Sequence, residues 1–248
     1  MWIATKGGGD RAGTLECIKE SQRRLNIATI DLWQFHGINT FVGLERVLGL
    51  GGGLEGAQAA LQAGQIRHIG FSSHSLKVAL KAVASGHFET VQFPLNFVSD
   101  EAADELLPLA QEHDMGFIAM KPFAGGRIQK ANLAIKYLLQ FENVVPDPGI
   151  EKVEEIEEIV GIVNSGDWEL TDQERQEVGE IRARVGTRFC RQCEYCMPYT
   201  GCAYLWCAVS QDFVGTVAAR NVFLWTVYWG ICGSRCRECR GLHRVWRV

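Results

Sequence analysis

The chain has 248 residues, of which 47% are hydrophobic and 22% charged, an ordinary globular composition with enough apolar mass for a sizeable core. A net charge of −4 argues against nucleic acid as a partner, and no stretch has the roughly 18 uninterrupted apolar residues of a membrane helix. The opening MWIATKGGGD lacks the basic and apolar regions of a signal peptide, so we expect a cytoplasmic protein.

From residue 2 to about 164, short apolar runs alternate with amphipathic stretches. The apolar runs are predicted strands, at 2–5, 30–35, 66–71, 90–93, 116–120 and 143–145. The amphipathic stretches are predicted helices, near 14–25, 53–63, 75–85, 100–113, 129–141 and 151–164. Six consecutive βα units with fully apolar strands are typical of a parallel α/β sheet. A (β/α)₈ TIM barrel needs eight units, so the sequence predicts an incomplete barrel that lacks its first two.

Polar side chains follow or end five of the predicted strands. They are Lys6, His36, the pair Ser72 and Ser73, Gln92 and Lys121. In barrels the C-terminal strand ends carry the chemistry, so we expect these side chains to line one face. Taken singly, a lysine or a histidine after a strand is most often solvated or structural.

Three strings, in this order and at this spacing, resemble the aldo-keto reductase family: IATK (3–6), IDLWQFHG (30–37) and GQIRHIGFSSH (64–74). The resemblance covers residues 1–165 and implies hydride transfer from NADPH to a small carbonyl substrate. It implies that Lys6 lowers the pKa of a tyrosine that gives the proton, and that His36 orients the carbonyl. It also implies that Ser72, Ser73 and Gln92 hold the nicotinamide carboxamide.

The sequence departs from the family pattern at three places. Met120, followed by Lys121, stands where the family has an aromatic residue that stacks on the nicotinamide, although a thioether can also pack on a ring. Glu158 matches a glutamate at the adenosine end, but acids replace the basic residue that would read a 2′-phosphate, so NADPH and NADH both stay open. The family's catalytic aspartate and tyrosine have no counterpart here, so we expect negligible carbonyl reduction by this sequence alone.

A cysteine motif follows the predicted barrel. In RFCRQCEYCMP (188–198), Cys190, Cys193 and Cys196 have the C-x₂-C-x₂-C spacing that begins a [4Fe–4S] run, while zinc is the alternative metal. The string resembles that of a family subgroup with a fourth cysteine after Met-Pro, where this chain has Tyr199. We expect an iron–sulfur motif whose fourth ligand is missing.

The composition changes at residue 199. Residues 199–248 contain no lysine, two acids and six arginines, without helical or strand periodicity. Codons that encode 242–248 can be chosen so that reading one base later gives Cys-Thr-Glu-Cys-Gly-Glu, which resembles a second cysteine cluster. We therefore interpret 199–248 as an irregular, cysteine-rich, out-of-frame tail. The expected domains are a barrel at 1–165, a helical connector at 166–189, the cysteine motif at 190–198 and this tail.

Two functions remain open at this point. The first is an NAD(P)H-dependent oxidoreductase that reduces a carbonyl and carries an associated iron–sulfur motif. The alternative is a catalytically inactive fragment, or an iron–sulfur electron-transfer module with a vestigial barrel and a redox partner. A brown chromophore without NAD(P)H turnover would favour the alternative.

Overall fold

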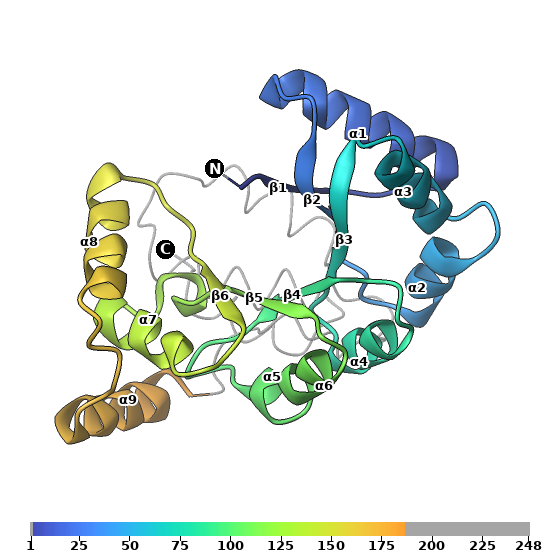
Figure 1. Cartoon of the computed structure of the whole chain (residues 1–248). Coiled ribbons are helices and arrows are strands. Elements are labelled where there is room, and N and C mark those ends of the chain that lie inside the picture. Colours follow the sequence, from blue (N-terminus) through green and yellow to red (C-terminus); the bar gives the residue numbers. More distant parts are fainter. Residues whose placement is uncertain (1, 187–248) are drawn as a thin grey trace, which may run out of the picture. The chain divides into compact units, whose positions relative to one another are not determined.

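The computed structural model describes residues 2–186, in which six parallel strands form one curved sheet (Figure 1). Each strand pairs with the next in chain order: β1 (Ala4–Gly7), β2 (Ile30–Phe35), β3 (Ile66–Ser72), β4 (Thr90–Pro94), β5 (Gly116–Met120) and β6 (Val144–Asp147). This order, with a helical crossover after each of the first five strands, is consistent with part of a TIM barrel. The predicted α/β class and the parallel six-stranded sheet are confirmed.

Helices cover the outer side of the curved sheet (Figure 1). They are α1 (Arg11–Leu25), α2 (Phe41–Leu48), α3 (Gly53–Gln62), α4 (Leu76–Ala84), α5 (Glu101–Asp104), α6 (Leu106–Glu112), the short 3₁₀ turn η1 (Ala124–Gly126), α7 (Ala131–Leu139), α8 (Val153–Asn164) and α9 (Asp172–Val185). Local chemistry sets several of their ends. The Asp10 carboxylate accepts the Gly13 N–H at the start of α1, and Asn26 ends that helix with a left-handed backbone.

The strands lie within two residues of their predicted bounds, but three elements differ from expectation. The first strand runs on to Gly7, so Lys6 lies inside β1 rather than after it, because its backbone pairs in register with Gln34. The predicted helix at 100–113 is broken at Glu105. Helix α2 was not predicted; it is short, lies in a glycine-rich stretch and begins where the Thr40 hydroxyl accepts the Gly43 N–H at 3.0 Å.

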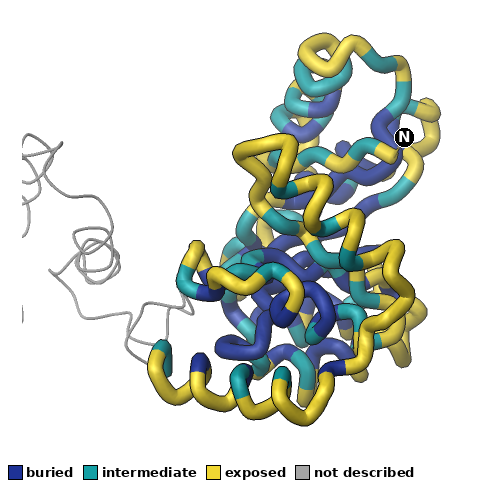
Figure 2. Tube along the Cα trace, turned by 90° about the vertical axis from the view of Figure 1, so that its left-hand side faces the viewer, coloured by how far each residue is buried: buried dark blue, intermediate teal, exposed yellow. Residues whose placement is uncertain are grey.

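The hydrophobic core lies between the sheet and its outer helices. Trp33, Phe35, Phe71 and Phe117 are at most 1% exposed and pack with buried residues of the helices. Figure 2 shows the dark-blue buried tube running through the centre of this unit, with exposed turns outside it. Burying each aromatic side chain contributes about 1.5–3 kcal/mol, so this outward-facing half of the sheet supplies much of the driving force for folding.

Helix α9 belongs to the stretch that was predicted as a connector, and it packs on the preceding fold. Arg182 pairs with Asp100 at 2.5 Å, and its guanidinium lies 6.0 Å from the centre of the Tyr137 ring. Lys136, which is 9% exposed, lies 3.3 Å from Glu174. The described residues through Val185 accordingly form one compact unit.

Candidate functional site

The inner face of the sheet is unusually polar for a barrel. Side chains alternate between the faces of a strand, so residues paired across neighbouring strands share a face. Lys6 pairs with Gln34, while Thr90 and Gln92 pair with Gly70 and Ser72. Along β2, β3 and β4, this face alternates with the outward-facing core residues Trp33, Phe35, Phe71 and Phe93. Barrel interiors are normally filled by branched apolar side chains, so a polar inner face marks this region for function.

Three inner-face side chains are buried and incompletely hydrogen bonded. Gln34 is 1% exposed, Gln92 is 2% and Thr90 is 8%. Within residues 2–186, no partner is found for Gln34 Nε2, Thr90 Oγ1 or Gln92 Oε1. Most buried polar atoms in proteins are hydrogen bonded, and each exception calls for an explanation. A ligand that supplies the missing partners is one such explanation.

Lys6 and His36 lie near each other at the same end of two adjacent parallel strands. Lys6 is in β1 opposite Gln34, and His36 follows β2 directly, with its N–H donated to the Gly7 carbonyl at 2.9 Å. Both residues are exposed. The two residues thus lie at the same end of adjacent strands, with Lys6 one residue before the end of its strand, while a common pocket with Gln92 stays a prediction. Their chemical roles remain predictions.

Ser72 and Ser73 end the third strand and are buried. The Ser72 hydroxyl accepts the Gly37 N–H at 2.9 Å and has a longer, 3.5 Å contact with the Phe35 carbonyl. The Ser73 hydroxyl donates to the Ile38 carbonyl at 2.7 Å. Both hydroxyls thus bind the chain that follows β2.

Gln92 and Asp147 connect the fourth strand to the sixth across the inner face. Gln92 Nε2 donates to the Asp147 carboxylate, and the Gln92 carbonyl oxygen Oε1 is the unpartnered atom. Met120, 8% exposed, pairs in register with Pro94 and Asp147 and so lies on the same face. Lys121 follows it with a left-handed backbone, φ 58°.

His74 is a site residue that the sequence analysis did not single out. Burial, and then the positive charges of Lys121, His36 and Lys6, lower the pKa of His74 to about 4. Its Nε2 is buried without a partner among the described residues. His74 is therefore neutral at pH 7 and lies within the field of side chains from three other strand ends. The string GFSSH contains it, but its burial could not be read from sequence.

The remaining predicted residues are not brought into this cluster. Glu158 is exposed on α8 and does not lie at a strand end. Cys190, Cys193 and Cys196 lie outside the described residues. Within 2–186, no group of three His, Cys, Asp or Glu side chains could hold a metal ion. In the same range, no helix is long and apolar enough to cross a bilayer.

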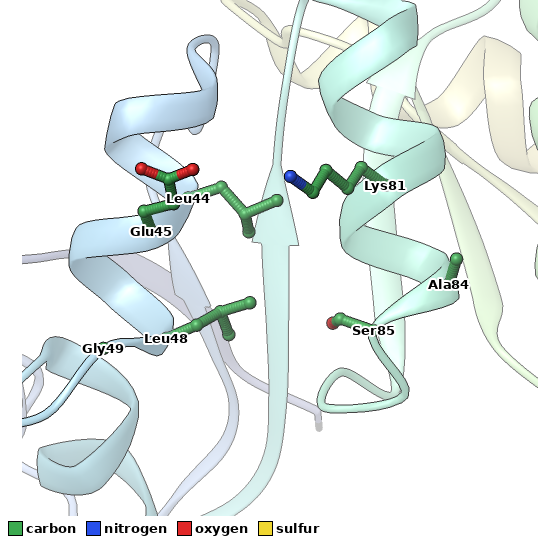
Figure 3. Close-up of a pocket in the computed structure, with 7 residues that line it drawn as sticks. All are labelled: Leu44, Glu45, Leu48, Gly49, Lys81, Ala84 and Ser85. Atoms are coloured by element: carbon green, nitrogen blue, oxygen red, sulfur yellow. The ribbon is translucent and has the colours of Figure 1, made fainter.

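A separate groove of about 610 Å³ lies between α2 and α4, in the outer helical layer. Figure 3 shows Leu44, Leu48 and Lys81 pointing into the space between these two helices. None of the strand-end side chains lines this groove. The inner face of the sheet therefore remains the candidate site.

Comparison with known proteins gives a consistent result. The model of the aldo/keto reductase family matches residues 1–133. An uncharacterised oxidoreductase of Schizosaccharomyces pombe is 28% identical in an alignment of 187 residues that covers 64% of this chain. That match spans only 59% of the length of the yeast relative.

Solved structures show the same fold. The aldo-keto reductase AKR11C1 from Bacillus halodurans, in its holo form, matches with a TM-score of 0.60 and 22% identity, over 73% of this chain and 72% of that one. An aldo-keto reductase from Klebsiella pneumoniae in complex with NADPH matches with a TM-score of 0.60 and 17% identity, over 72% and 69% of the two chains. At these identities the likeness establishes the fold.

Proposed function

Because the chain belongs to the aldo/keto reductase family, we propose that its strand ends bind NADPH or NADH and serve hydride transfer to a small carbonyl substrate. The observation that carries this proposal is the unpartnered Oε1 of Gln92. The Nε2 group of the same amide donates to Asp147, and this bond fixes the direction in which Oε1 points. A buried acceptor without a donor costs about 1–3 kcal/mol, and a carboxamide N–H would supply that donor.

Ser72 complements Gln92 in this role. Its hydroxyl oxygen accepts from Gly37, but its own proton makes only the 3.5 Å contact, a weak hydrogen bond at best. That proton can turn to donate to the carboxamide oxygen. Ser73 has less to offer a ligand, because its proton is engaged at 2.7 Å and only a lone pair of its oxygen is left.

We propose three further contacts with the cofactor, from Met120, Lys121 and Glu158. Met120 lies on the inner face, where its thioether can pack on the nicotinamide ring in place of an aromatic residue. Lys121, the next residue, is proposed to contact the cofactor beside Met120. Glu158, on α8, is proposed to hold the adenosine end. The acids around it favour NADH as much as NADPH, so the test below compares the two.

When bound, the reduced nicotinamide supplies the hydride. Lys6 and His36 would act on the substrate side of the site. A cation such as Lys6 favours the charged form of a neighbouring proton donor and lowers its pKa. His36 presents an imidazole that can hold the carbonyl oxygen in line, and neutral His74 adds a further polar ring without adding charge.

For the cysteine motif, we propose that Cys190, Cys193 and Cys196 bind three irons of a [4Fe–4S] cluster. The support is the spacing of the three thiolates. Anaerobic reconstitution with iron and sulfide tests it, with iron content and visible absorbance as readouts. Replacing the three cysteines by serine should abolish the absorbance, and an unchanged spectrum would contradict the proposal.

Calorimetric titration of the whole chain with NADPH and with NADH tests the cofactor proposal. We expect saturable binding of at least one of the two, at one site per chain. The control is Leu48→Ala in the α2/α4 groove, which should leave the affinity unchanged. Binding of neither nucleotide by folded protein would contradict the proposal.

Turnover with an aldehyde is a separate measurement. No residue of this sequence is assigned to the family's tyrosine or aspartate, and general acid catalysis typically contributes 10²–10⁴-fold. We therefore expect the chain to bind cofactor but to reduce carbonyls slowly. Fast NADPH-dependent turnover would show that another group gives the proton, and loss of that turnover in Lys6→Met would identify Lys6.

A further inference from the structure

The segment 36–39, here called the His36 segment, lies at the carboxyl ends of the strands and is held there by hydrogen bonds from its backbone N–H groups. The N–H of His36 donates to the Gly7 carbonyl at 2.9 Å. The N–H of Gly37 donates to the Ser72 hydroxyl at 2.9 Å, and the N–H of Ile38 donates to the Ser72 carbonyl at 2.8 Å. Gly37 has φ 68°, a conformation that glycine adopts without strain. The segment is therefore bonded to both neighbouring strands.

Ser73 adds a side-chain bond to this arrangement. It is 0% exposed, and its hydroxyl has a single proton. The Ile38 carbonyl is the nearest acceptor at 2.7 Å, whereas the Ser75 carbonyl and Asn39 Oδ1 lie at 3.3 and 3.4 Å. The hydroxyl oxygen also accepts the Ser75 N–H at 3.1 Å. The proton of Ser73 is thus committed to the His36 segment.

Asn39 accepts a second hydrogen bond at the far end of the same segment. Its Oδ1 accepts the backbone N–H of His74 at 2.8 Å. Residues 38 and 39 therefore accept hydrogen bonds from residues 73 and 74, although the pairs are separated by 35 positions in the chain. The two loops carry His36 and His74, and the charge of His36 is among the causes that lower the pKa of His74.

We propose that Ser73 and Asn39 are positioning residues, which clasp the His36 segment to the end of β3 and so set where His36 is held. The importance of the His36 position for catalysis rests on the proposed function. The clasp itself, the bonds of Ser73 and Asn39 between the two segments, is present in the chain without ligand. This proposal gives the two neighbouring serines different roles. Ser72 keeps a proton for a ligand, whereas Ser73 acts through His36 and does not hold the carboxamide.

Backbone hydrogen exchange and histidine ring resonances, measured by NMR on the whole chain, test the clasp without any activity. In Ser73→Ala the Ile38 carbonyl loses its partner, so we expect the amides of Gly37 and Ile38 to exchange at least about tenfold faster. We also expect the His36 ring resonance to shift. The ring resonance of His68, at the opposite ends of the strands, is the internal control and should not move.

Asn39 provides the matched pair of variants. Asn39→Asp keeps an acceptor for the His74 N–H, and Asn39→Ala removes it. We expect Asn39→Ala to speed exchange of the His74 amide and shift the His36 ring resonance, and Asn39→Asp to restore both toward the original. Asn39 is only partly buried, so we expect both of its variants to fold. This pair therefore tests the proposal even if Ser73→Ala does not fold. Equal behaviour of Asn39→Asp and Asn39→Ala would overturn the proposal.

NADPH titration of Ser73→Ala supplies the second decisive result. We expect its dissociation constant for NADPH to stay within about threefold of that of the original chain. This is a smaller change than the loss of one hydrogen bond to the ligand would cause. A tenfold loss of NADPH affinity with unchanged exchange at Gly37 and Ile38 would make Ser73 a carboxamide ligand and refute the clasp. If the original chain binds no nucleotide, the proposed function fails, while the exchange and ring measurements still decide the clasp.

Discussion

The two ends of the strands satisfy their polar groups differently. At the amino ends, the Asp31 carboxylate accepts the Ile3 N–H at 2.9 Å and pairs with Arg67. Glu89 likewise pairs with His68 and accepts the Ile69 N–H at 3.2 Å. Each of these acids joins two strands, with one bond to a side chain and one to the backbone.

At the carboxyl ends, several buried polar atoms have no partner among residues 2–186, whereas at the amino ends only Thr90 Oγ1, in the first residue of β4, lacks one in that range. Gln92 Oε1 and His74 Nε2 are the nearest to the strand termini, and Lys121 adds a left-handed backbone there. An unpartnered buried group destabilises the fold, so its retention indicates a use other than stability. The difference indicates that the amino ends hold the sheet together, and it supports our proposal that the carboxyl ends bind a ligand.

The largest expected effect compares two glutamines of the inner face. Gln92→Met removes the acceptor proposed for the carboxamide and should weaken NADPH binding about 10–100-fold. Gln34→Met is the matched control, because Gln34 lies in the register of Thr90, two residues before that of Gln92. Our proposal assigns no cofactor atom to Gln34, so NADPH affinity should not change, and removal of an unpartnered donor should leave stability equal or higher. Calorimetry and urea unfolding measure both, and equal NADPH affinity in the two variants would break the comparison.

The second effect is on stability at the amino ends. The Ile3 N–H, and then the charge of Arg67, lower the pKa of Asp31. A lowered carboxyl pKa contributes stability above the unfolded value, and this is lost as the pH falls through the folded one. Asp31→Asn should therefore lower the melting temperature at pH 7 and flatten its decline in acid, while NADPH affinity stays the same. Weakened NADPH binding by the folded variant would contradict the division between the two ends.

The smallest effect concerns the pH dependence at the carboxyl ends. His74 has a pKa of about 4 in the fold, so between pH 6.5 and 4 the unfolded chain takes up a proton that the folded chain refuses. Stability should fall as the pH drops through this window. After discounting for the partial exposure of the ring, the loss is about 1–2 kcal/mol.

His74→Gln removes this titration, so its unfolding free energy should change less between pH 7 and pH 4.5 than that of the original chain. Urea unfolding at the two pH values measures the difference. Parallel curves for the two proteins would mean that His74 titrates normally.

Much of the fold could be predicted because its signals are local. The apolar runs IDLWQF and GFIAM coincide with β2 and β5, and the order of motifs placed Lys6 and His36 at one end of adjacent strands. Helix α2 was missed because it is only eight residues long and glycines flank it, although its apolar residues have a helical spacing. His74 was missed because its lowered pKa comes from burial and from Lys121, 47 positions away, which no local pattern reports.

The roles of the two serines illustrate the same limit. Sequence alone treats Ser72 and Ser73 as an equivalent pair, since both follow the third strand. Only the three-dimensional arrangement shows that one hydroxyl is engaged at 2.7 Å by the Ile38 carbonyl while the other keeps a weakly held proton. Contacts between residues 35 positions apart therefore distinguish the two serines and underlie the different roles that we propose for them.

The central claim, that the carboxyl strand ends bind the nicotinamide cofactor, is tested most directly by hydrogen exchange of the whole chain with and without saturating NADPH. The amides of Gly37, Ile38 and Ser73 should exchange more slowly with the nucleotide present, while those of Ile3 and Ile69 at the amino ends should keep their rates. Protection confined to the amino ends, or no change at Gly37, Ile38 and Ser73 under saturating nucleotide, would contradict the claim.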